Sequence, residues 1–201
     1  MAVDKKVCIA TARPVGELCK KWAKENTPQG FSLTDDIEAS DIIISVKYDK
    51  ILSKETVEKK QCFNFHPAPL PKYRGVGLAS WFIINREKSG GVSLHKIDEG
   101  IDTGPIIEVR EFSISEGDTA QVVFNKCEKM ILEMFQDWYN NLLKGKFSLK
   151  PQETKNRKLY REKDIQKAKD LTRYARAFDF EGKELAYYYN KRGEKIYLKY
   201  D

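Results

Sequence analysis

Apolar residues in the first third of the chain fall into short continuous runs separated by helical patterns. Continuous runs of this length are typical of strands covered on both faces, whereas apolar residues three and four apart predict an amphipathic helix. The strands expected on this basis are 6–11, 31–33, 41–46 and 61–65, and the helices are 15–26 and 53–60. This strand–helix alternation predicts an α/β fold with a parallel sheet and crossover helices.

The segment 66–71 (HPAPLP) contains three prolines, which remove backbone donors and fix φ, so it is expected to be a rigid extended loop. Asp118 is expected to cap the clearest helix, which closes at Lys144 and Gly145. The apolar stripe of that helix is interpreted as core. The remaining elements predicted in this part of the chain are a helix at 77–86 and strands at 91–97 and 105–114.

Composition places the chain among globular proteins, with 41% hydrophobic and 33% charged residues and no apolar run of bilayer length. The start carries no signal-peptide pattern, so we expect a cytoplasmic protein with no membrane association. The four cysteines contain no C-x-x-C pair, and only two histidines are available to assist them. We therefore expect reduced core cysteines and no metal site.

The net charge of +6, which favours an anionic partner, is concentrated near the C-terminus. Residues 144–201 carry 17 Lys and Arg against 9 Asp and Glu, together with seven of the ten tyrosines, whereas residues 1–143 have a net charge of −2. We place a catalytic domain at 1–146 and a C-terminal helix and β-hairpin appendage at 147–201. Such an appendage can bind a nucleotide by stacking and charge, or pack on the main domain or a second subunit with its lysines solvated.

Within the appendage, the pattern predicts one helix and one hairpin. The helix is expected at 162–177, and the hairpin strands at 186–189 and 195–200, joined by a turn-like stretch that contains Gly193.

Three polar residues fall where α/β sheets place functional sites, at or after the carboxyl ends of strands. Asn64 and His66 come at the end of a predicted central strand and, being two apart, share a face. Asp102 lies in a loop bracketed by Gly100 and Gly104 after the next strand. We expect these three side chains to point toward one reacting centre.

An asparagine, a histidine and an aspartate suit a reaction in which an oxygen becomes negatively charged. The amide and the imidazole can donate to that oxygen, and the aspartate can orient the histidine or hold a proton through water. Nothing flanks Cys62 to lower its pKa, so direct acyl transfer to an external amine is favoured over a covalent acyl-enzyme. The spacing alone also fits a turn-forming pair and an ordinary loop with no catalytic role.

Two segments, in this order and separation, resemble the signature of the folate-dependent formyltransferases. They are 63–75 (FNFHPAPLPKYRG) and 91–107 (GVSLHKIDEGIDTGPII). The resemblance implies a Rossmann-like, mostly parallel sheet with flanking helices, shortened at the N-terminal side. It implies transfer of a formyl group from 10-formyltetrahydrofolate to an amine. Asn64 and His66 would hold the formyl oxygen as it becomes an oxyanion, and Asp102 would assist His66 and proton removal from the amine.

The resemblance extends to the expected folate site. The run 48–52 resembles the segment whose backbone reads the pteridine edge, and 98–102 resembles the loop that closes over that ring. The residues that this resemblance implies for folate binding are Tyr48, Lys50, Ile51, Leu52, Asp98, Gly100 and Ile101.

The two segments look most like those of sugar N-formyltransferases, which act on a nucleotide-linked 4-amino-4,6-dideoxyhexose. This resemblance implies that the C-terminal region stacks a nucleobase or forms a homodimer contact. We expect a nucleotide sugar rather than a nucleic acid as the anionic partner, and nucleic acid stays a minor alternative. The residues implied for nucleotide-sugar binding are Arg13, Lys72, Tyr73, Arg74, Arg176, Phe178 and Tyr187. For Arg13 and for 72–74, a solvated surface position is an equal alternative.

Several alternative functions also fit parts of the sequence. Glycinamide ribonucleotide as the acceptor fits the length but not the tail, and methionyl-tRNA explains the positive tail but normally goes with a larger C-terminal domain. A formyl-folate hydrolase would usually carry an extra N-terminal domain. A non-catalytic binding protein is the alternative from another class, because Asn64 comes earlier than is usual in the family, as if a strand–helix unit were trimmed.

His95 is interpreted as a strand residue that packs or bonds to backbone, and Trp81 as core.

Overall fold

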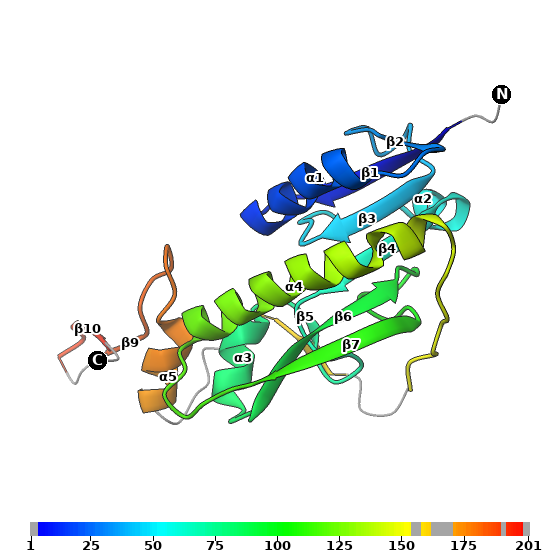
Figure 1. The fold of residues 1–201 in the computed structure, drawn as a ribbon. Coiled ribbons are helices and arrows are strands. Elements are labelled where there is room, and N and C mark those ends of the chain that lie inside the picture. Colours follow the sequence, from blue (N-terminus) through cyan, green and yellow to red (C-terminus); the bar gives the residue numbers. More distant parts are fainter. Residues whose placement is uncertain (1–3, 154–157, 162–170, 190–191, 199–201) are drawn as a thin grey trace.

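A six-stranded sheet forms the centre of the protein (Figure 1). The computed structural model describes residues 4–153, 158–161, 171–189 and 192–198. The strands of this sheet are β1 Lys5–Thr11, β2 Phe31–Leu33, β3 Ile42–Val46, β4 Gln61–His66, β6 Ser89–Lys96 and β7 Ile106–Ser113. Their order is β2-β1-β3-β4-β6-β7. The first four pair in parallel, and β6 and β7 are antiparallel to their neighbours. The predicted α/β class with a mostly parallel sheet is confirmed.

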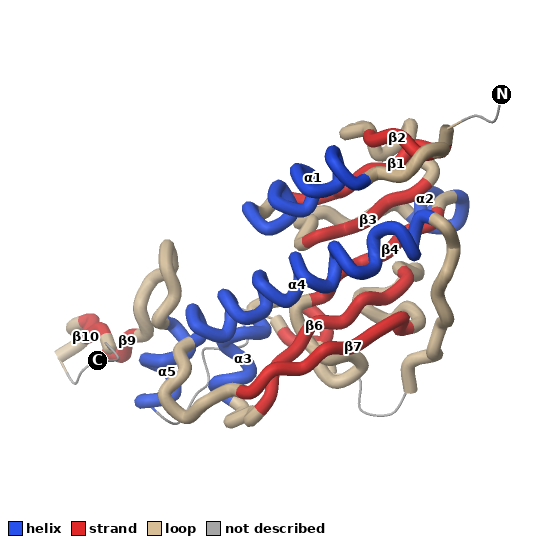
Figure 2. Tube along the Cα trace, in the orientation of Figure 1, coloured by secondary structure: helices blue, strands red, loops and turns tan. Residues whose placement is uncertain are grey.

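Helices and loops cover both faces of the sheet (Figure 2). The helices are α1 Pro14–Asn26, α2 Lys54–Lys59, α3 Leu78–Ile84, α4 Ala120–Leu143 and α5 Leu171–Phe178. α1 and α4 lie side by side over one face, where Ile9, Ile44 and Phe65 join the main apolar core. On the other face, Ala10 and Ile43 belong to a smaller cluster. Coverage on both faces explains why β3 reads as a continuous apolar run, since all five of its residues are buried.

The long helix α4 begins one residue later than the sequence predicts. Its N-cap is Thr119, whose hydroxyl accepts a hydrogen bond from the backbone N–H of Val122 at 3.4 Å. The carboxylate of Asp118 instead accepts from the backbone N–H of Ser115 at 3.0 Å and from Lys126 Nζ at 2.6 Å. Asp118 therefore closes the preceding turn rather than capping the helix, because its side chain already has these two donors.

The segment after α4 returns to the main domain. Its short strand β8 Leu159–Tyr160 pairs in parallel with β5 Arg74–Gly75, and the ring of Tyr160 stacks on that of Tyr73 with centroids 4.6 Å apart. α5 packs against α3, and Ala177 shares an apolar cluster with Tyr160. The division between 1–146 and 147–201 stays a prediction, but the described C-terminal residues share a core with the residues before them.

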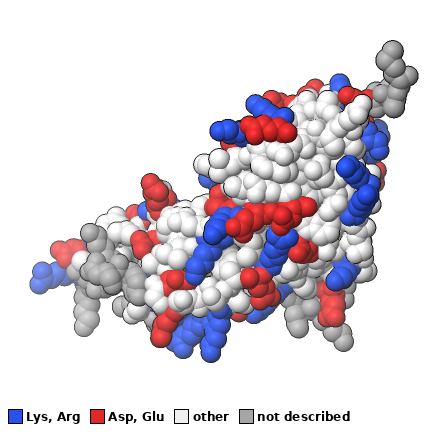
Figure 3. Space-filling model, in the orientation of Figure 1, with Lys and Arg blue, Asp and Glu red and all other residues white. Residues whose placement is uncertain are grey.

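The predicted C-terminal hairpin is confirmed as β9 Tyr187–Tyr189 and β10 Lys195–Tyr197, which pair antiparallel, while residues 199 and 200 of the expected second strand lie outside the described residues. The expected helix over 162–177 corresponds to α5, and residues 162–170 lie outside the described part of the chain. On the face drawn in Figure 3, Lys and Arg side chains lie next to Asp and Glu side chains rather than in one basic patch. Within the described ranges, no helix is long and apolar enough to cross a membrane.

Candidate active site

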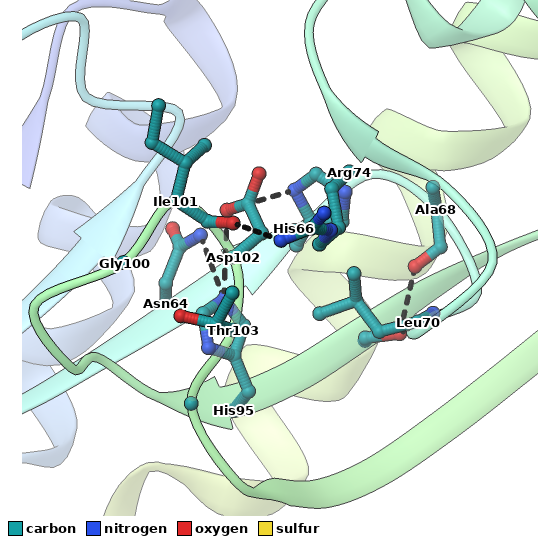
Figure 4. Close-up of polar contacts among 12 residues, drawn as sticks. Asn64, His66, Ala68, Leu70, Arg74, His95, Gly100, Ile101, Asp102 and Thr103 are labelled. Atoms are coloured by element: carbon teal, nitrogen blue, oxygen red, sulfur yellow. Dashed lines mark hydrogen bonds and ion pairs between the residues drawn. The ribbon is translucent and has the colours of Figure 1, made fainter. Parts of the chain in front are cut away.

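One strand and one loop bring the three predicted residues together (Figure 4). Asn64 and His66 are carried by the last three residues of β4, and β6 runs antiparallel beside them. Asp102 lies in the loop between β6 and β7, with a φ of 53° in the left-handed region. This conformation, which aspartate tolerates better than most residues, turns its side chain toward β4.

His66 is buried, and each of its ring nitrogens lies near one oxygen atom. Its Nε2 lies 2.7 Å from the backbone carbonyl oxygen of Tyr73, so Nε2–H donates to that oxygen. Its Nδ1 lies 3.4 Å from Oδ1 of Asp102. Because the carbonyl fixes the proton on Nε2, Nδ1 is the nitrogen that can exchange a proton with Asp102 or with a bound ligand.

Backbone groups and a buried glutamine hold Asp102 in place. Its Oδ2 accepts a hydrogen bond from the backbone N–H of Gly75 at 2.9 Å. Nε2 of Gln152 donates to the carbonyl oxygens of Asp102, at 3.1 Å, and of Gly104, at 2.6 Å. The loop is therefore tied both to β5 and to the segment that follows α4.

Asn64 is bonded to the second histidine of the chain. Its Nδ2 donates to Nε2 of His95 at 3.1 Å, while Nδ1–H of His95 donates to the carbonyl oxygen of Lys96 at 2.9 Å. Burial and, to a lesser extent, the neighbouring His66 lower the pKa of His95 to about 4, against a smaller opposing effect of Asp102. His95 is thus a neutral imidazole at pH 7 whose Nε2 lone pair accepts the Asn64 amide.

Ser93 braces the proline-rich loop that follows His66. Its hydroxyl accepts from the backbone N–H of Leu70 at 2.9 Å and donates to the carbonyl oxygen of Ala68 at 2.7 Å. Ser93 is fully buried, and it lies directly opposite His66 in the strand pairing. The brace fixes the direction in which the chain leaves β4, and so the distance from His66 to the Tyr73 carbonyl.

Cys62 does not belong to this site. Its side chain is buried in the small cluster with Ala10 and Ile43, and burial raises the pKa of its thiol to about 11. A thiolate nucleophile is therefore unavailable at neutral pH. The chemistry left to Asn64, His66 and Asp102 is the stabilisation of a developing negative charge and the movement of a proton.

Comparison with known proteins identifies the family. The sequence profile described as formyl transferase matches residues 13–137, which include all three residues of the site. The chain belongs to this family. The prediction made from the two signature segments is confirmed at that level.

Two curated formyltransferases match the same region. The methionyl-tRNA formyltransferase of Thermodesulfovibrio yellowstonii is 42% identical over 111 residues, which are 54% of this chain and 36% of that protein. The GDP-perosamine N-formyltransferase of Brucella melitensis is 40% identical over 106 residues, which are 48% of this chain and 41% of that protein. Each alignment therefore spans less than half of the relative.

Two solved structures have the same fold as this chain. The sugar N-formyltransferase from a Shewanella species has a TM-score of 0.83 at 19% identity, and the match covers 98% of this chain and 97% of that one. The N-formyltransferase from Helicobacter canadensis, in complex with folinic acid and dTDP-3-aminofucose, has a TM-score of 0.76 at 22% identity, with 88% and 81% covered. The likeness in fold extends beyond the family profile into the C-terminal region.

In this formyl transferase, the residues expected to bind folate lie on two loops. Tyr48 and Leu52 are half-buried and pack on the smaller cluster, whereas Ile51 is 88% exposed and Ile101 is 50% exposed. An ion pair of 3.0 Å between Lys54 and Glu99 links the chain just after the first loop to the second. Of the other residues expected to bind folate, Lys50 and Gly100 are exposed. Asp98 accepts a hydrogen bond from the backbone N–H of Gly100 at 3.1 Å.

Of the residues expected to bind the nucleotide sugar, four precede the C-terminal region, and three of these have accessible side chains. Arg13 is exposed at the N-cap of α1, Lys72 forms a 2.8 Å ion pair with Glu87, and Nη1 of Arg74 donates to the carbonyl oxygen of Ile101 at 3.5 Å. The side chain of Tyr73 is 1% exposed, with its ring packed on Phe82 and Tyr160. Substrate binding by the Tyr73 ring is therefore corrected to a core role, because its apolar neighbours enclose it.

The expected C-terminal binding residues lie on α5 and β9. The guanidinium of Arg176 donates to the carbonyl oxygen of Asp118 and lines a cavity of about 680 Å³ beside the ends of α3 and β7. Phe178 packs on Tyr174, and Tyr187 is 39% exposed on the hairpin. None of Asn64, His66 and Asp102 lines that cavity, so Arg176 is not gathered with them around the reacting centre.

Three contacts of the site are absent from the sequence-based prediction. The Tyr73 carbonyl is a backbone atom, so no residue type marks it. The sequence predicts that His95 packs or bonds to backbone, and it does bond to the Lys96 carbonyl, but its contact with Asn64 depends on β6 pairing with β4. Gln152 lies outside the matched family profile, and it reaches the loop because Lys150, two residues earlier, pairs with Ile106 at the start of β7.

Proposed function

We propose that this chain is a cytoplasmic enzyme that transfers a formyl group from 10-formyltetrahydrofolate to the amino group of a nucleotide-linked amino sugar. The observation that supports the proposal most strongly is the convergence of the Asn64 amide, Nδ1 of His66 and the Asp102 carboxylate at the end of β4. Family membership supports formyl transfer, and likeness in fold to sugar N-formyltransferases over nearly the full length of both chains supports the acceptor class.

In this mechanism, Asn64 and His66 stabilise the negative charge that develops on the formyl oxygen. One hydrogen of Asn64 Nδ2 is used by His95, which leaves the other to donate to that oxygen. His66 presents Nδ1 on the side of Asp102 and donates from there when protonated. Donors held in a buried site before the substrate arrives stabilise such a charge by more than the same donors do in water.

Asp102 handles the proton of the attacking amine. The amine attacks in its neutral form and loses a proton as the new C–N bond forms and the bond from the formyl carbon to the donor nitrogen breaks. Oδ1 of Asp102, 3.4 Å from Nδ1 of His66, takes that proton directly or through water. Passing it to the departing nitrogen returns the Asp102–His66 pair to its starting state.

The two loops fit the formyl donor. Ile51 and Ile101 present apolar surface to solvent, which suits contact with the flat ring of a folate, and the Lys54–Glu99 ion pair joins the segments that carry them. We infer that 48–52 and 98–101 bind the donor, which supplies the activated formyl group. The Helicobacter canadensis structure of the same fold, in complex with folinic acid, is consistent with this assignment.

A nucleotide-linked amino sugar is the acceptor that the whole-chain comparison favours. The Brucella melitensis relative acts on GDP-perosamine, and the Helicobacter canadensis protein binds dTDP-3-aminofucose. We assign Arg13, Lys72 and Arg74 to the diphosphate or the sugar of such an acceptor. The identity of 42% with a methionyl-tRNA formyltransferase makes methionyl-tRNA the second candidate.

The C-terminal hairpin suits a contact with a second copy of the chain. Its rings at Tyr189 and Tyr197 are 64% and 50% exposed, and the two strands β9 and β10 form a sheet of their own. Exposed aromatic side chains are enriched at protein interfaces. We propose a homodimer through this hairpin.

An acceptor panel tests the proposed function. The protein is incubated with 10-formyltetrahydrofolate and, separately, with dTDP-, UDP- and GDP-linked amino sugars and with methionyl-tRNA. A mass gain of one formyl group on an amino sugar is the expected result. Formylation of methionyl-tRNA alone would replace the proposed acceptor with the second candidate, and no product with any amine would contradict formyl transfer by this chain.

A further inference from the structure

His95 lies directly opposite Asn64, and its ring is closed off from solvent. β6 pairs these two residues, and the strand register between β6 and β7 shifts at Leu94 and His95. Only 2% of His95 is exposed, and both of its ring nitrogens are used, by the Lys96 carbonyl and by the Asn64 amide, which leaves the imidazole no polar group for a bound substrate. Any effect of His95 on the reaction therefore passes through Asn64 or through Asp102, whose Oδ1 is 3.8 Å from Nε2.

The hydrogen bonds of His95 determine which way the Asn64 amide faces. The Lys96 carbonyl accepts from Nδ1–H, so Nε2 of the neutral ring has a lone pair and no hydrogen. That lone pair accepts from Nδ2 of Asn64 at 3.1 Å. If the amide were rotated by half a turn, its oxygen would face this lone pair, and two acceptors would meet without a hydrogen between them.

We propose that His95 is a positioning residue that locks the Asn64 amide with its second N–H directed at the formyl oxygen. This inference rests on the proposed function and adds a residue to it. Without the lock, the two orientations of the amide differ little in shape, and one of them presents an oxygen to the developing negative charge. The lock therefore contributes to the rate of transfer and not to the binding of either substrate.

Substitutions that keep or remove the acceptor test this role. His95→Gln places an amide oxygen near the position of Nε2, whereas His95→Met fills similar space with no comparable acceptor. With 10-formyltetrahydrofolate and dTDP-4-amino-4,6-dideoxyglucose, we expect His95→Met to lower kcat by about 10-fold or more and to leave both KM values within about twofold. His95→Gln should keep kcat within about threefold of the wild type. Leu94→Met, a conservative core change on the same strand, is the matched control.

A double-mutant cycle separates positioning from a general loss of structure. If His95 acts through Asn64, adding His95→Met to Asn64→Ala should change kcat by less than about twofold, because the group that His95 orients is gone. A full 10-fold loss in the Asn64→Ala background would overturn the proposal. So would an unchanged kcat for His95→Met alone, or equal losses in the Met and Gln variants.

A readout that needs no turnover distinguishes this inference from the proposed function. In ¹⁵N NMR spectra, Nδ1 of His95 should carry the proton, and the side-chain amide hydrogens of Asn64 should exchange slowly with solvent. That protection should be lost in His95→Met and retained in His95→Gln. If the wild type formylates no amine while this pattern holds, the proposed function is contradicted, but the fixing of the Asn64 amide by His95 is supported. If the wild type is active and His95→Met keeps the protection, only the proposed role of His95 is contradicted.

Discussion

At the scale of single residues, Asp102 connects the chemistry of the site to its frame. One carboxylate oxygen faces Nδ1 of His66, and the other accepts from the backbone N–H of Gly75. The backbone of Asp102 has a left-handed conformation and is bonded through its carbonyl oxygen to Gln152. The charge of Asp102 and its position can therefore be changed separately.

Asp102→Asn removes the charge and keeps the shape. The amide oxygen can still accept from the N–H of Gly75, so the loop should keep its place. Without a carboxylate to take the proton of the amine, we expect kcat to fall by about 100-fold or more while KM for the acceptor changes little. Steady-state kinetics and a thermal unfolding curve check this. A variant with wild-type kcat would remove Asp102 from the mechanism.

The buried His95 predicts a loss of stability in acid. Its pKa is about 4 in the folded protein and about 6.5 in the unfolded chain, so the unfolded state binds an extra proton between these values. Its contribution is fully present above pH 6.5 and is lost as the pH falls toward 4. The charged or titratable neighbours that act on it are His66, Asp102 and Asp98.

His95→Gln has no proton to bind at this position. Its free energy of unfolding, measured with urea at pH 7 and pH 5, should fall less between the two values than that of the wild type. Equal decreases in the two proteins would show that His95 does not carry this part of the acid sensitivity.

The residue types of the site could be predicted from the sequence, but not all of its contacts. Asn64 and His66 share a face because they are two apart on one strand, and that rule needs no tertiary information. The contact between Asn64 and His95 depends on strand pairing across many residues, and the bond from His66 to the Tyr73 carbonyl depends on the path of the loop. Neither of these two contacts can be predicted from local sequence patterns.

At the scale of elements, the segment after α4 is part of the active-site frame. Lys150 pairs with Ile106 at the start of β7 through two backbone hydrogen bonds of 2.8 Å. Two residues later, Gln152 reaches the loop between β6 and β7. The long helix α4 was predictable from its apolar period, whereas the two-residue strands β5 and β8 are too short to leave a pattern.

Gln152→Met should weaken this clamp without changing a group that meets substrate. One buried carbonyl oxygen, of Gly104, and one partly buried carbonyl oxygen, of Asp102, would lose their donor, which costs about 1–3 kcal/mol of stability. Because the Asp102 loop is then less restrained, we expect kcat to fall by about 10-fold. Gln29→Met, at an exposed position, is the matched control. Unchanged kcat with lowered stability would limit Gln152 to a structural role.

At the scale of the whole molecule, described residues on both sides of the predicted boundary at residue 147 share an apolar cluster. Tyr160 stacks on Tyr73, and Ala177 belongs to the same apolar cluster. The composition of 147–201 differs from that of 1–146, but charge and tyrosine content describe its surface and not where its apolar side chains pack. The hairpin β9–β10, by contrast, forms a separate two-stranded sheet.

Two truncations distinguish these parts. A chain ending at residue 182 lacks the hairpin and should keep a melting temperature near that of the wild type while becoming monomeric by light scattering. A chain ending at residue 153 also loses Tyr160 and Ala177, and its melting temperature should fall by about 5 °C or more. Equal melting temperatures for the two chains would contradict a shared core, and a dimer in the first would contradict the hairpin contact.

The central claim is that Asn64 and His66 stabilise the charge that develops during formyl transfer. The most direct measurement is kcat for transfer from 10-formyltetrahydrofolate to dTDP-4-amino-4,6-dideoxyglucose by the wild type, Asn64→Ala and His66→Asn, with dissociation constants for both substrates. We predict losses in kcat of about 100-fold or more and nearly unchanged dissociation constants. Wild-type kcat in either variant, or losses that appear only in the dissociation constants, would contradict the account.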